Sequence, residues 1–362
     1  MMEKSTRRIL ILLSIISAIG LITLYSASYI MTYRYPYPPA DYYLVHQLVA
    51  LVVGVILMVI LSLVDYRKHE AYTGLYYILT LVALVAVFFS SRVAGSHRWI
   101  MIGSYSIQSS EFAKIFLLLY IASYVYRQNG DISTFKKGVF DPLVRLLPIY
   151  VLVFLEPDLG TTILLFILTL VVLYVAGAKL LHILGVVGAG LLIFLVAFAM
   201  GFLHSYQAER LTSFFTYIMT GQSNYQSTMA MSAINSGGFL GSGPGGAIYK
   251  FFLPVQFSDF IFAVFGEEFG LIGIVLLILL YYMLVREIVH IGIKVEDTFA
   301  KVYIVGFAFL IGLQILFNAG VSLGILPVTG ITLPFVSYGG SSIIALLAGL
   351  GVVINIAYTN RD

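Results

Sequence analysis

A single carboxylate stands where a long polar loop re-enters an apolar segment. The loop covers roughly residues 202–259, and residues 253–262 read LPVQFSDFIF, so that Asp259 is followed at once by apolar residues. Desolvation in such a setting should raise the pKa of the Asp259 carboxyl, which suits a general base near neutral pH. A Ser-Asp pair before an apolar run is also typical of an amino-terminal helix cap. Asp259 is therefore a candidate for both roles, which do not exclude each other.

A second pair of charges lies in an otherwise apolar stretch. Glu111 and Lys114 are three residues apart, so on a helix they share a face and can pair, which lowers the cost of placing either near lipid. The pair is either a structural ion pair or part of the wall of a polar cavity that opens outward. Arg98 precedes the only tryptophan, and this suits either an interfacial anchor or a site for an anionic lipid headgroup.

Further candidates lie in two turns and in the long loop. Asp158, after Glu156-Pro157, is well placed to cap the next helix and could add a binding role. The glycine-rich stretch 236–246 would let backbone amides approach an anion closely, although such a turn is a weak signal and no P-loop pattern is present. The further candidate substrate-binding residues are Arg210, Gln226, Ser236, Gly237 and Ser337.

Two adjacent acids follow Asp259 within the same apolar segment. An unpaired charge there costs roughly 2.5–3.5 kcal/mol on insertion scales, and Glu267 and Glu268 cannot both face one partner. They could bind a cation, relay protons or pair with Arg or Lys of another span, and we favour pairing. The sequence requires no cofactor. A divalent cation, Mg²⁺ or Mn²⁺, is possible with Glu267 or Glu111 as ligand, but no ligand spacing demands one.

The stretch 318–342 is apolar yet interrupted by two prolines and several glycines. Irregular backbone at membrane depth is tolerated where protein shields it, so the pattern predicts a re-entrant segment that lines a cavity. A plain outer turn is the alternative.

The elements that must position these residues are helices in lipid. Hydrophobic residues make up 60% of the 362 residues and charged residues only 10%, and the mean hydropathy is +1.00. Because backbone amides in hydrocarbon must pair internally, repeated apolar stretches of about 20 residues indicate an all-α, polytopic helical bundle. The absence of cysteine excludes disulfides and thiolate metal sites. We expect ten spans, near 9–30, 42–63, 71–90, 110–126, 143–156, 158–176, 182–203, 259–285, 298–320 and 339–358.

The spans form one transmembrane domain over residues 1–362, with the first span uncleaved. The junction at Glu156-Pro157-Asp158 could instead be one kinked helix. With both termini cytoplasmic, most of the 20 Lys and Arg fall in or beside inner segments, which fits the positive-inside rule. The loop 202–259 and the stretch 90–110 then face outward. Six basic residues lie outside or at an outer edge, namely Arg34, Arg92, Arg98, Lys114, Arg210 and Lys250.

These motifs together resemble the shape, elongation, division and sporulation (SEDS) family, the RodA and FtsW polymerases of bacterial cell-wall synthesis. The resemblance spans essentially all ten predicted segments. It is carried by residues 98–100, by Ser110-Glu111 with Lys114, by 157–161, by 236–238, by Leu253-Pro254 with 259–262, by Glu267-Glu268 and by 327–342.

The resemblance implies a peptidoglycan glycosyltransferase that polymerises lipid II at the outer face of the cytoplasmic membrane, usually with a class B penicillin-binding protein as partner. It implies the essential loop aspartate at Asp259, the paired cavity residues at Glu111 and Lys114, and outward basic positions at Arg98 and Arg210. Membrane lipids are expected partners and nucleic acid is not. A role in cell shape or in division follows, with a slight lean to the FtsW type.

The chain departs from the family pattern close to the expected base. The family usually has Gln-Pro-Ser-Glu where residues 108–111 read QSSE, Gln-Pro-Asp where 156–158 read EPD, and Leu-Pro-Glu-x-His-Thr-Asp where 253–259 read LPVQFSD. The last change removes an acid and a histidine beside Asp259. Two other functions remain open, a transporter or flippase of lipid-linked precursors and a non-catalytic scaffold for a penicillin-binding protein.

Overall fold

The fold is seen in a computed structural model that describes residues 2–29, 38, 40–90, 98–103, 105–201, 212, 213, 216, 219 and 225–360. It is almost entirely helical. The first half contains α1 (Met2–Ser28), α2 (Ala40–Leu63), α3 (Tyr66–Ala71), α4 (Thr73–Val87), β1 (Ile100–Ile102), β2 (Tyr105–Ile107), α5 (Ser109–Arg127), the π-helical turn η2 (Lys136–Phe140), α6 (Asp141–Leu155) and α7 (Leu159–Val175). The second half contains α8 (Leu180–Ala199), α10 (Tyr225–Gly237), the 3-10 turn η3 (Tyr249–Phe251), α11 (Ile261–Lys294), α12 (Thr298–Ser322) and α13 (Gly340–Thr359).

Each of the ten expected spans coincides with one long helix. Among the described residues, seven helical segments are long and apolar enough to cross a membrane, and α4 and α7 are shorter apolar helices. The remaining span is α5, which carries Glu111 and Lys114 on its first turns. The chain is therefore a multi-pass helical membrane protein. The Glu156-Pro157-Asp158 junction separates two helices, because α6 ends at Leu155 and α7 begins at Leu159.

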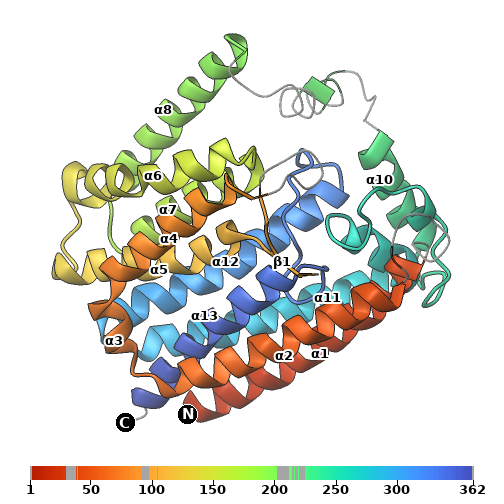
Figure 1. Cartoon of the computed structure of the whole chain (residues 1–362), viewed down its shortest axis with the longest axis horizontal. Helices are drawn as coiled ribbons and strands as arrows, with labels where there is room; N and C mark the ends of the chain where they lie inside the picture. Colours follow the sequence, from red (N-terminus) through yellow and green to blue (C-terminus); the bar gives the residue numbers. More distant parts are fainter. Residues whose placement is uncertain are drawn as a thin grey trace.

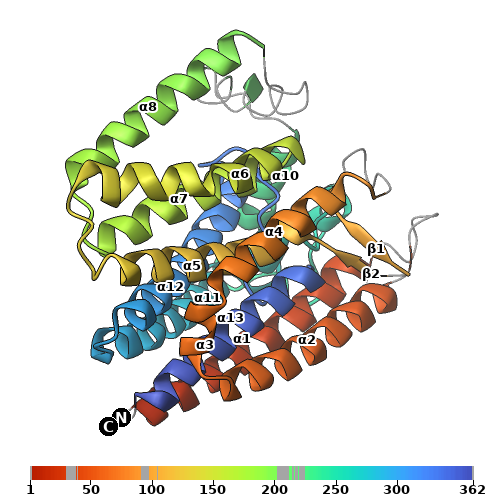
Figure 2. The same ribbon diagram turned by 60° about the vertical axis from the view of Figure 1, so that its left-hand side comes forward.

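The centre of the bundle is formed by α5, α12 and α13, with α2 and α1 along one side (Figure 1). Side chains of Ala113, Leu117 and Leu118 on α5 are fully buried, as are Phe307 and Leu310 on α12. The helix α8 is the exception, because Figures 1 and 2 both show it running away from the bundle and nearly all of its side chains are accessible. Such a helix suits contact with lipid or with another membrane helix. The marked N and C ends lie together at one end of the bundle (Figure 2).

Two irregular regions pack at the other end of the bundle. The first is a short antiparallel hairpin, in which Ile100 pairs with Ile107, and it leads directly into α5. The second is the segment between α12 and α13, residues 323–339, which has no regular structure. Two glycines let it approach its neighbours: a Cβ on Gly20 of α1 would stand 2.6 Å from the carbonyl oxygen of Phe335, and one on Gly160 of α7 would stand 2.5 Å from that of Thr329. The segment is thus shielded by protein, as irregular backbone at membrane depth requires.

Candidate active site

One large cavity, of about 1320 Å³, lies where these irregular regions meet α2, α5 and the start of α11. Its wall brings together four residues that the sequence singled out, Arg98, Glu111, Asp158 and Asp259. They come from four different parts of the chain. Polar and aromatic side chains that also line it are Tyr42, His46, Trp99, Tyr105, Gln108, Phe257, Ser258, Thr332, Tyr338, Ser341 and Ser342, and apolar residues such as Val49, Val53, Leu57 and Ile344 complete the wall.

Asp259 lies in a series of turns that precede α11, and its side chain is only partly buried. The amino-terminal cap of α11 is Phe260, with no side-chain capping bond, so Asp259 is not the cap residue. Its backbone carbonyl accepts a hydrogen bond of 3.2 Å from Asn318 Nδ2. Its Oδ2 lies 3.7 Å from where a Cβ on Gly330 would stand, so the segment 323–339 passes beside the carboxylate.

The segment 323–339 holds the turn that carries Asp259. Ser337 Oγ donates to the carbonyl of Ser258 at 2.7 Å and accepts from the amide of Leu333 at 2.8 Å. The amide of Tyr338 donates to the carbonyl of Phe257 at 2.9 Å. Ser337 is buried and does not line the cavity, so it lies behind the wall and fixes the residue next to Asp259. The expectation of an irregular segment that lines a cavity is confirmed, and its re-entry into the membrane stays a prediction.

Glu111 and Lys114 form the predicted ion pair. Lys114 Nζ lies 2.6 Å from Glu111 Oε2, and both side chains are almost fully buried. Glu111 lines the cavity, whereas Lys114 stands behind it. A buried carboxylate is tolerated only when it is paired, so Lys114 makes it possible for an acid to face the cavity from within the bundle. The two predicted roles, structural pair and cavity wall, therefore coexist.

Asp158 caps α7 and lines the cavity at the same time. Its Oδ1 accepts from the amide of Thr161 at 3.1 Å and its Oδ2 from the Thr161 hydroxyl at 3.0 Å. Gln108 Nε2 also reaches its Oδ2, at 3.4 Å. Arg98 fixes the preceding turn, because its Nε donates to the Glu156 carbonyl at 3.0 Å and its Nη2 donates to the Pro157 carbonyl. Arg98 is thus a positioned cation of the cavity wall.

The acid before this proline is buried in the turn between α6 and α7. Glu156 has no exposed surface. Burial, together with the nearby Asp158 carboxylate, raises the pKa of the Glu156 carboxyl to about 9, while Arg98 and Ser109 act in the opposite direction. The group is consequently neutral at pH 7. A protonated carboxyl has nearly the shape of the glutamine that the family pattern places here and, like that amide, offers both a donor and an acceptor.

Several nominated residues lie away from the cavity. Gln226, Ser236 and Gly237 belong to α10 and are not among the lining residues. A Cβ on Gly237 would collide with the carbonyl oxygen of Gly266, so this glycine serves close packing of α10 against α11. Arg210 lies outside the described residues.

The glycine-rich stretch after α10 pairs with α11 instead of forming an open nest. The helix α11 is broken at Gly270, which has a φ of 64°, a conformation that favours glycine. Carbonyls freed near this break accept from the loop: the amide of Ser242 donates to Glu267 O at 2.9 Å and that of Gly243 to Glu268 O at 3.0 Å.

The adjacent acids Glu267 and Glu268 face different partners, as expected. Glu267 Oε1 accepts from the amides of Ile248 and Tyr249, at 2.6 and 3.1 Å. Glu268 Oε1 lies 3.3 Å from Lys250 Nζ. Across the described part of the chain, no group of three or more His, Cys, Asp or Glu side chains is placed to hold a metal ion. Glu111 and Glu267 are each engaged by protein donors.

Sequence reasoning missed three polar residues that shape the cavity. Gln47, within the apolar α2, donates to the Ser337 carbonyl at 2.8 Å and accepts from the Gly339 amide at 3.2 Å. His46 lines the cavity with its ring against Tyr105. Asn318 bridges the carbonyls of Asp259 and Ile331. The available signal was their polarity inside predicted spans, since intramembrane polar residues are costly and usually functional.

Comparison with known proteins finds similarity over nearly the whole chain. Residues 6–362 match the family of cell cycle proteins named after FtsW, RodA and SpoVE. A probable peptidoglycan glycosyltransferase FtsW of Coxiella burnetii is 35% identical over 358 residues, covering 95% of this chain and 94% of the relative. Stage V sporulation protein E of Bacillus subtilis is 33% identical and covers 98% of this chain and 97% of its own.

Two solved structures share the fold. A chain of a peptidoglycan synthase complex, in a structure concerned with coordination of polymerization and crosslinking, matches with a TM-score of 0.78 and 29% identity, covering 98% of both chains. The rod shape determining protein RodA of Thermus thermophilus matches with a TM-score of 0.72 and 28% identity, covering 98% of this chain and 97% of its own.

Proposed function

Because this chain belongs to the family of cell cycle proteins that includes FtsW, RodA and SpoVE, we propose that it is a peptidoglycan glycosyltransferase that polymerises lipid II. The observation that carries the proposal is the single cavity in which Asp259, Glu111, Asp158 and Arg98 meet. A cavity of about 1320 Å³ exceeds what a drug-sized ligand needs, as suits a lipid-linked disaccharide. The similar proteins span nearly the entire chain, so the whole reaction is assigned to this one domain.

Asp259 is the proposed general base. Its carboxylate takes the proton from the 4-hydroxyl of the acceptor sugar, and that oxygen forms a bond to the anomeric carbon of the donor sugar. The bond from the anomeric carbon to the diphosphate oxygen breaks on the opposite side, so the configuration inverts and undecaprenyl diphosphate leaves. The contacts from Ser337 and Asn318 to the backbone at Ser258 and Asp259 support this role, because they fix the position of the base.

Charge of the leaving diphosphate is offset by basic groups of the wall. Arg98 is the described cation that lines the cavity and is held by two backbone carbonyls. Arg210, in the loop 202–259, is proposed to assist. Lys114 acts through Glu111, because its ammonium group pairs with that carboxylate. The arrangement of the described acids does not by itself demand a divalent cation. Polymerisation assayed with and without added Mg²⁺ or Mn²⁺ measures whether such a cation contributes.

The membrane location and partner are proposed from the same features. The ends of the described chain lie together, and the basic residues favour cytoplasmic termini in the cytoplasmic membrane, with the cavity at the outer face. A class B penicillin-binding protein is the proposed partner, which is supported by the similarity to a chain of a peptidoglycan synthase complex. Elongation and division remain alternative settings for this activity.

The test is a polymerisation assay with purified full-length chain and lipid II, with products resolved on a gel, alone and with the cross-linking partner. Glycan strands are expected from the unmodified chain, and their loss is expected for Asp259→Ala with the folded protein intact. A flippase would move lipid II across vesicles without forming strands, and a scaffold would do neither. Strand synthesis by purified Asp259→Ala would overturn the proposed role of Asp259.

A further inference from the structure

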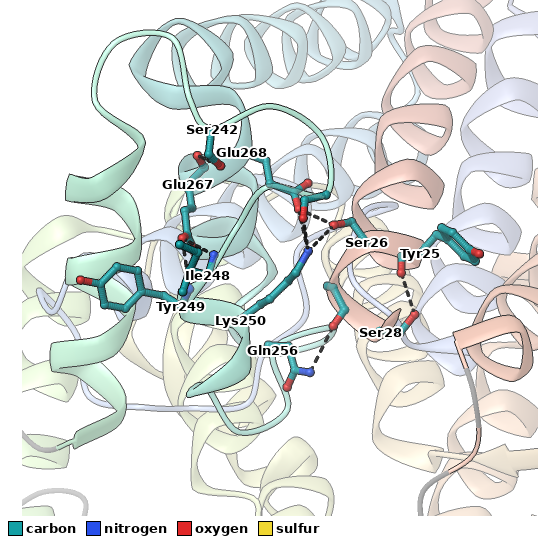
Figure 3. Close-up of polar contacts among 12 residues, drawn as sticks. Tyr25, Ser26, Ser28, Ser242, Ile248, Tyr249, Lys250, Gln256, Glu267 and Glu268 are labelled. Atoms are coloured by element: carbon teal, nitrogen blue, oxygen red, sulfur yellow. Dashed lines mark hydrogen bonds and ion pairs between the residues drawn. The ribbon is translucent and has the colours of Figure 1, made fainter. Parts of the chain in front are cut away.

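We propose that Lys250, Glu268 and Ser26 form an anchor that positions the base Asp259 without contacting the substrate. This inference rests on the proposed function. None of the three side chains lines the cavity, and all three are buried. Figure 3 shows them converging from the loop, from α11 and from the end of α1.

The ion pair at the centre of the anchor joins two parts of the chain. Lys250 Nζ lies 3.3 Å from Glu268 Oε1, and the side chains are 3% and 0% exposed. The same ammonium group donates to Ser26 Oγ and to the Gly245 carbonyl, each at 2.9 Å. Ser26 in turn donates to Glu268 Oε1. Lys250 therefore directs all three of its donors to named acceptors, which is the condition for a stable buried charge.

Neighbouring contacts tie the rest of the loop to the same two helices. Gln256 Nε2 donates to the Ala27 carbonyl at 3.1 Å, at the end of α1. Glu267 accepts from the amides of Ile248 and Tyr249, which directly precede Lys250. The loop is thus fixed on both sides of the ion pair, up to three residues before Asp259.

This anchor and the contacts of Asp259 lie at opposite ends of one short segment, residues 250–259. The far end is held by Ser337 and Asn318. Only eight residues separate Lys250 from Asp259. Leu253 lies between them and Phe260 follows Asp259, and both are buried in one apolar cluster with Ala27 and Ala247. A segment this short, with Leu253 and Gln256 buried within it, transmits a displacement at Lys250 to Asp259. A misplacement of about 1 Å at a reacting group can lower a rate by about 100-fold.

Apart from Val255, Phe257, Ser258 and Asp259, the cavity wall comes from elements outside the segment 250–259, namely α2, the region of the β1–β2 hairpin, α5, the turn before α7, the segment 323–339 and the start of α13. Loss of the anchor should therefore lower kcat and leave KM nearly unchanged. A merely structural role would reduce the amount of folded protein without this separation of kcat from KM.

The test uses the absence of cysteine in the chain. Ala247→Cys introduces one thiol at a position that is 2% exposed within the loop, and its reaction with maleimide reports release of the loop without reference to activity. Adding Lys250→Met should raise that reaction rate at least about tenfold, because the contacts of Lys250 Nζ with Glu268, Ser26 and Gly245 are lost and the loop opens locally more often. On lipid II the same chain should lose about 10- to 100-fold in kcat with less than about a threefold change in KM.

The matched control is Lys137→Met. Lys137 also lies near an acid, with Nζ 3.5 Å from Asp131 Oδ2, but both side chains are exposed, so thiol reactivity and kcat should not change. The double variant Lys250→Met/Glu268→Gln removes both buried charges, so that no unpaired charge is left to unfold the protein. It should fold like the parent yet keep the raised thiol reactivity and the lowered kcat.

Three results would overturn the anchor: an unchanged thiol reaction in Lys250→Met, a raised thiol reaction with unchanged kcat, or full recovery of both readouts in the double variant. Failure of the proposed function is seen separately, as strand synthesis by Asp259→Asn, and the thiol readout still tests the anchor in that case.

Discussion

Two buried Lys–Glu pairs serve the cavity in different ways. Glu111 and Lys114 are neighbours on the first turns of α5, and Glu111 of this pair lines the cavity. Lys250 and Glu268 come from a loop and from α11, and their pair lies behind the cavity wall. The first pair depends on a helix that forms regardless of it, whereas the second holds a loop that has little other regular structure. The same chemistry thus presents an acid to the cavity in one place and fixes a backbone in the other.

The largest expected effect comes from breaking the local pair. Glu111→Gln leaves the Lys114 ammonium buried without its carboxylate, and the free energy of unfolding should fall by about 3–5 kcal/mol. Chemical or thermal unfolding of purified protein measures it. The double variant Glu111→Gln/Lys114→Met should recover most of that loss, because α5 forms without the ion pair. It should not recover polymerisation. A loss below about 1 kcal/mol for the single variant would show that the pair is hydrated and not buried.

The packing of the loop against α11 is tested by two glycines, Gly241 and Gly243, which both have a left-handed backbone conformation. Gly241, with a φ of 81°, packs against the Glu268 carbonyl so closely that a Cβ would collide with it, whereas a Cβ on Gly243, with a φ of 85°, would meet no atom within 4 Å. Gly243→Ala should lower the free energy of unfolding by about 1–2 kcal/mol from backbone strain alone. Gly241→Ala should lower it more and should also lower kcat. Equal effects on stability and kcat at the two positions would mean that the contact with α11 is unimportant.

Glu156 is a third buried acid, and it differs from Glu111 and Glu268 because it is mostly neutral instead of paired with a lysine. Its pKa is about 9 in the folded protein and near 4.5 in the unfolded chain, so the folded state binds the additional proton between these values. Stability therefore falls as pH rises from about 4.5 towards 9. Glu156→Gln should remove this fall and add about 1–3 kcal/mol at pH 8, the usual magnitude for a buried polar group that is poorly satisfied. Unfolding curves at pH 6 and pH 8 measure it, and a parallel pH dependence in parent and variant would contradict the account.

The smallest effect on stability is expected for an ion pair that joins distant parts of the sequence but is largely exposed on one side. Arg8 and Glu287 form a pair between α1 and α11 at 3.1 Å, in which the Glu287 side chain is 9% exposed but the Arg8 side chain is 63% exposed. Arg8→Met should change the free energy of unfolding by less than about 1 kcal/mol, as is usual for accessible pairs. Unfolding under the conditions used for Glu111→Gln gives a direct comparison. A loss as large as that of the buried pairs would show that long-range pairing, and not burial, sets the contribution.

The sequence was informative wherever the signal was local. Apolar runs predicted all ten long helices, the three-residue spacing predicted the Glu111–Lys114 pair, and the position of Asp158 after a proline predicted a helix cap. These features depend on a few residues within one or two helical turns. The prolines and glycines between 318 and 342 likewise indicated the irregular segment that lines the cavity.

Long-range partners could not be predicted in the same way. Nothing local to Lys250 indicates Ser26 or Glu268, and nothing local to Gln47 indicates the turn at Ser337 and Gly339. The glycine-rich stretch illustrates the limit most clearly. Its composition fits an anion-binding nest as well as close packing, and only the break of α11 at Gly270 shows that its amides donate to helix carbonyls.

The central claim is that the Asp259 carboxylate accepts the proton of the attacking sugar hydroxyl. The most direct measurement is the turnover of purified Asp259→Asn on lipid II, compared with Asp158→Asn, whose carboxylate lines the same cavity but caps α7. Removing the base should lower kcat by about 100- to 10,000-fold with KM little changed, whereas Asp158→Asn should retain measurable turnover. Turnover of Asp259→Asn within about threefold of the parent would contradict the account.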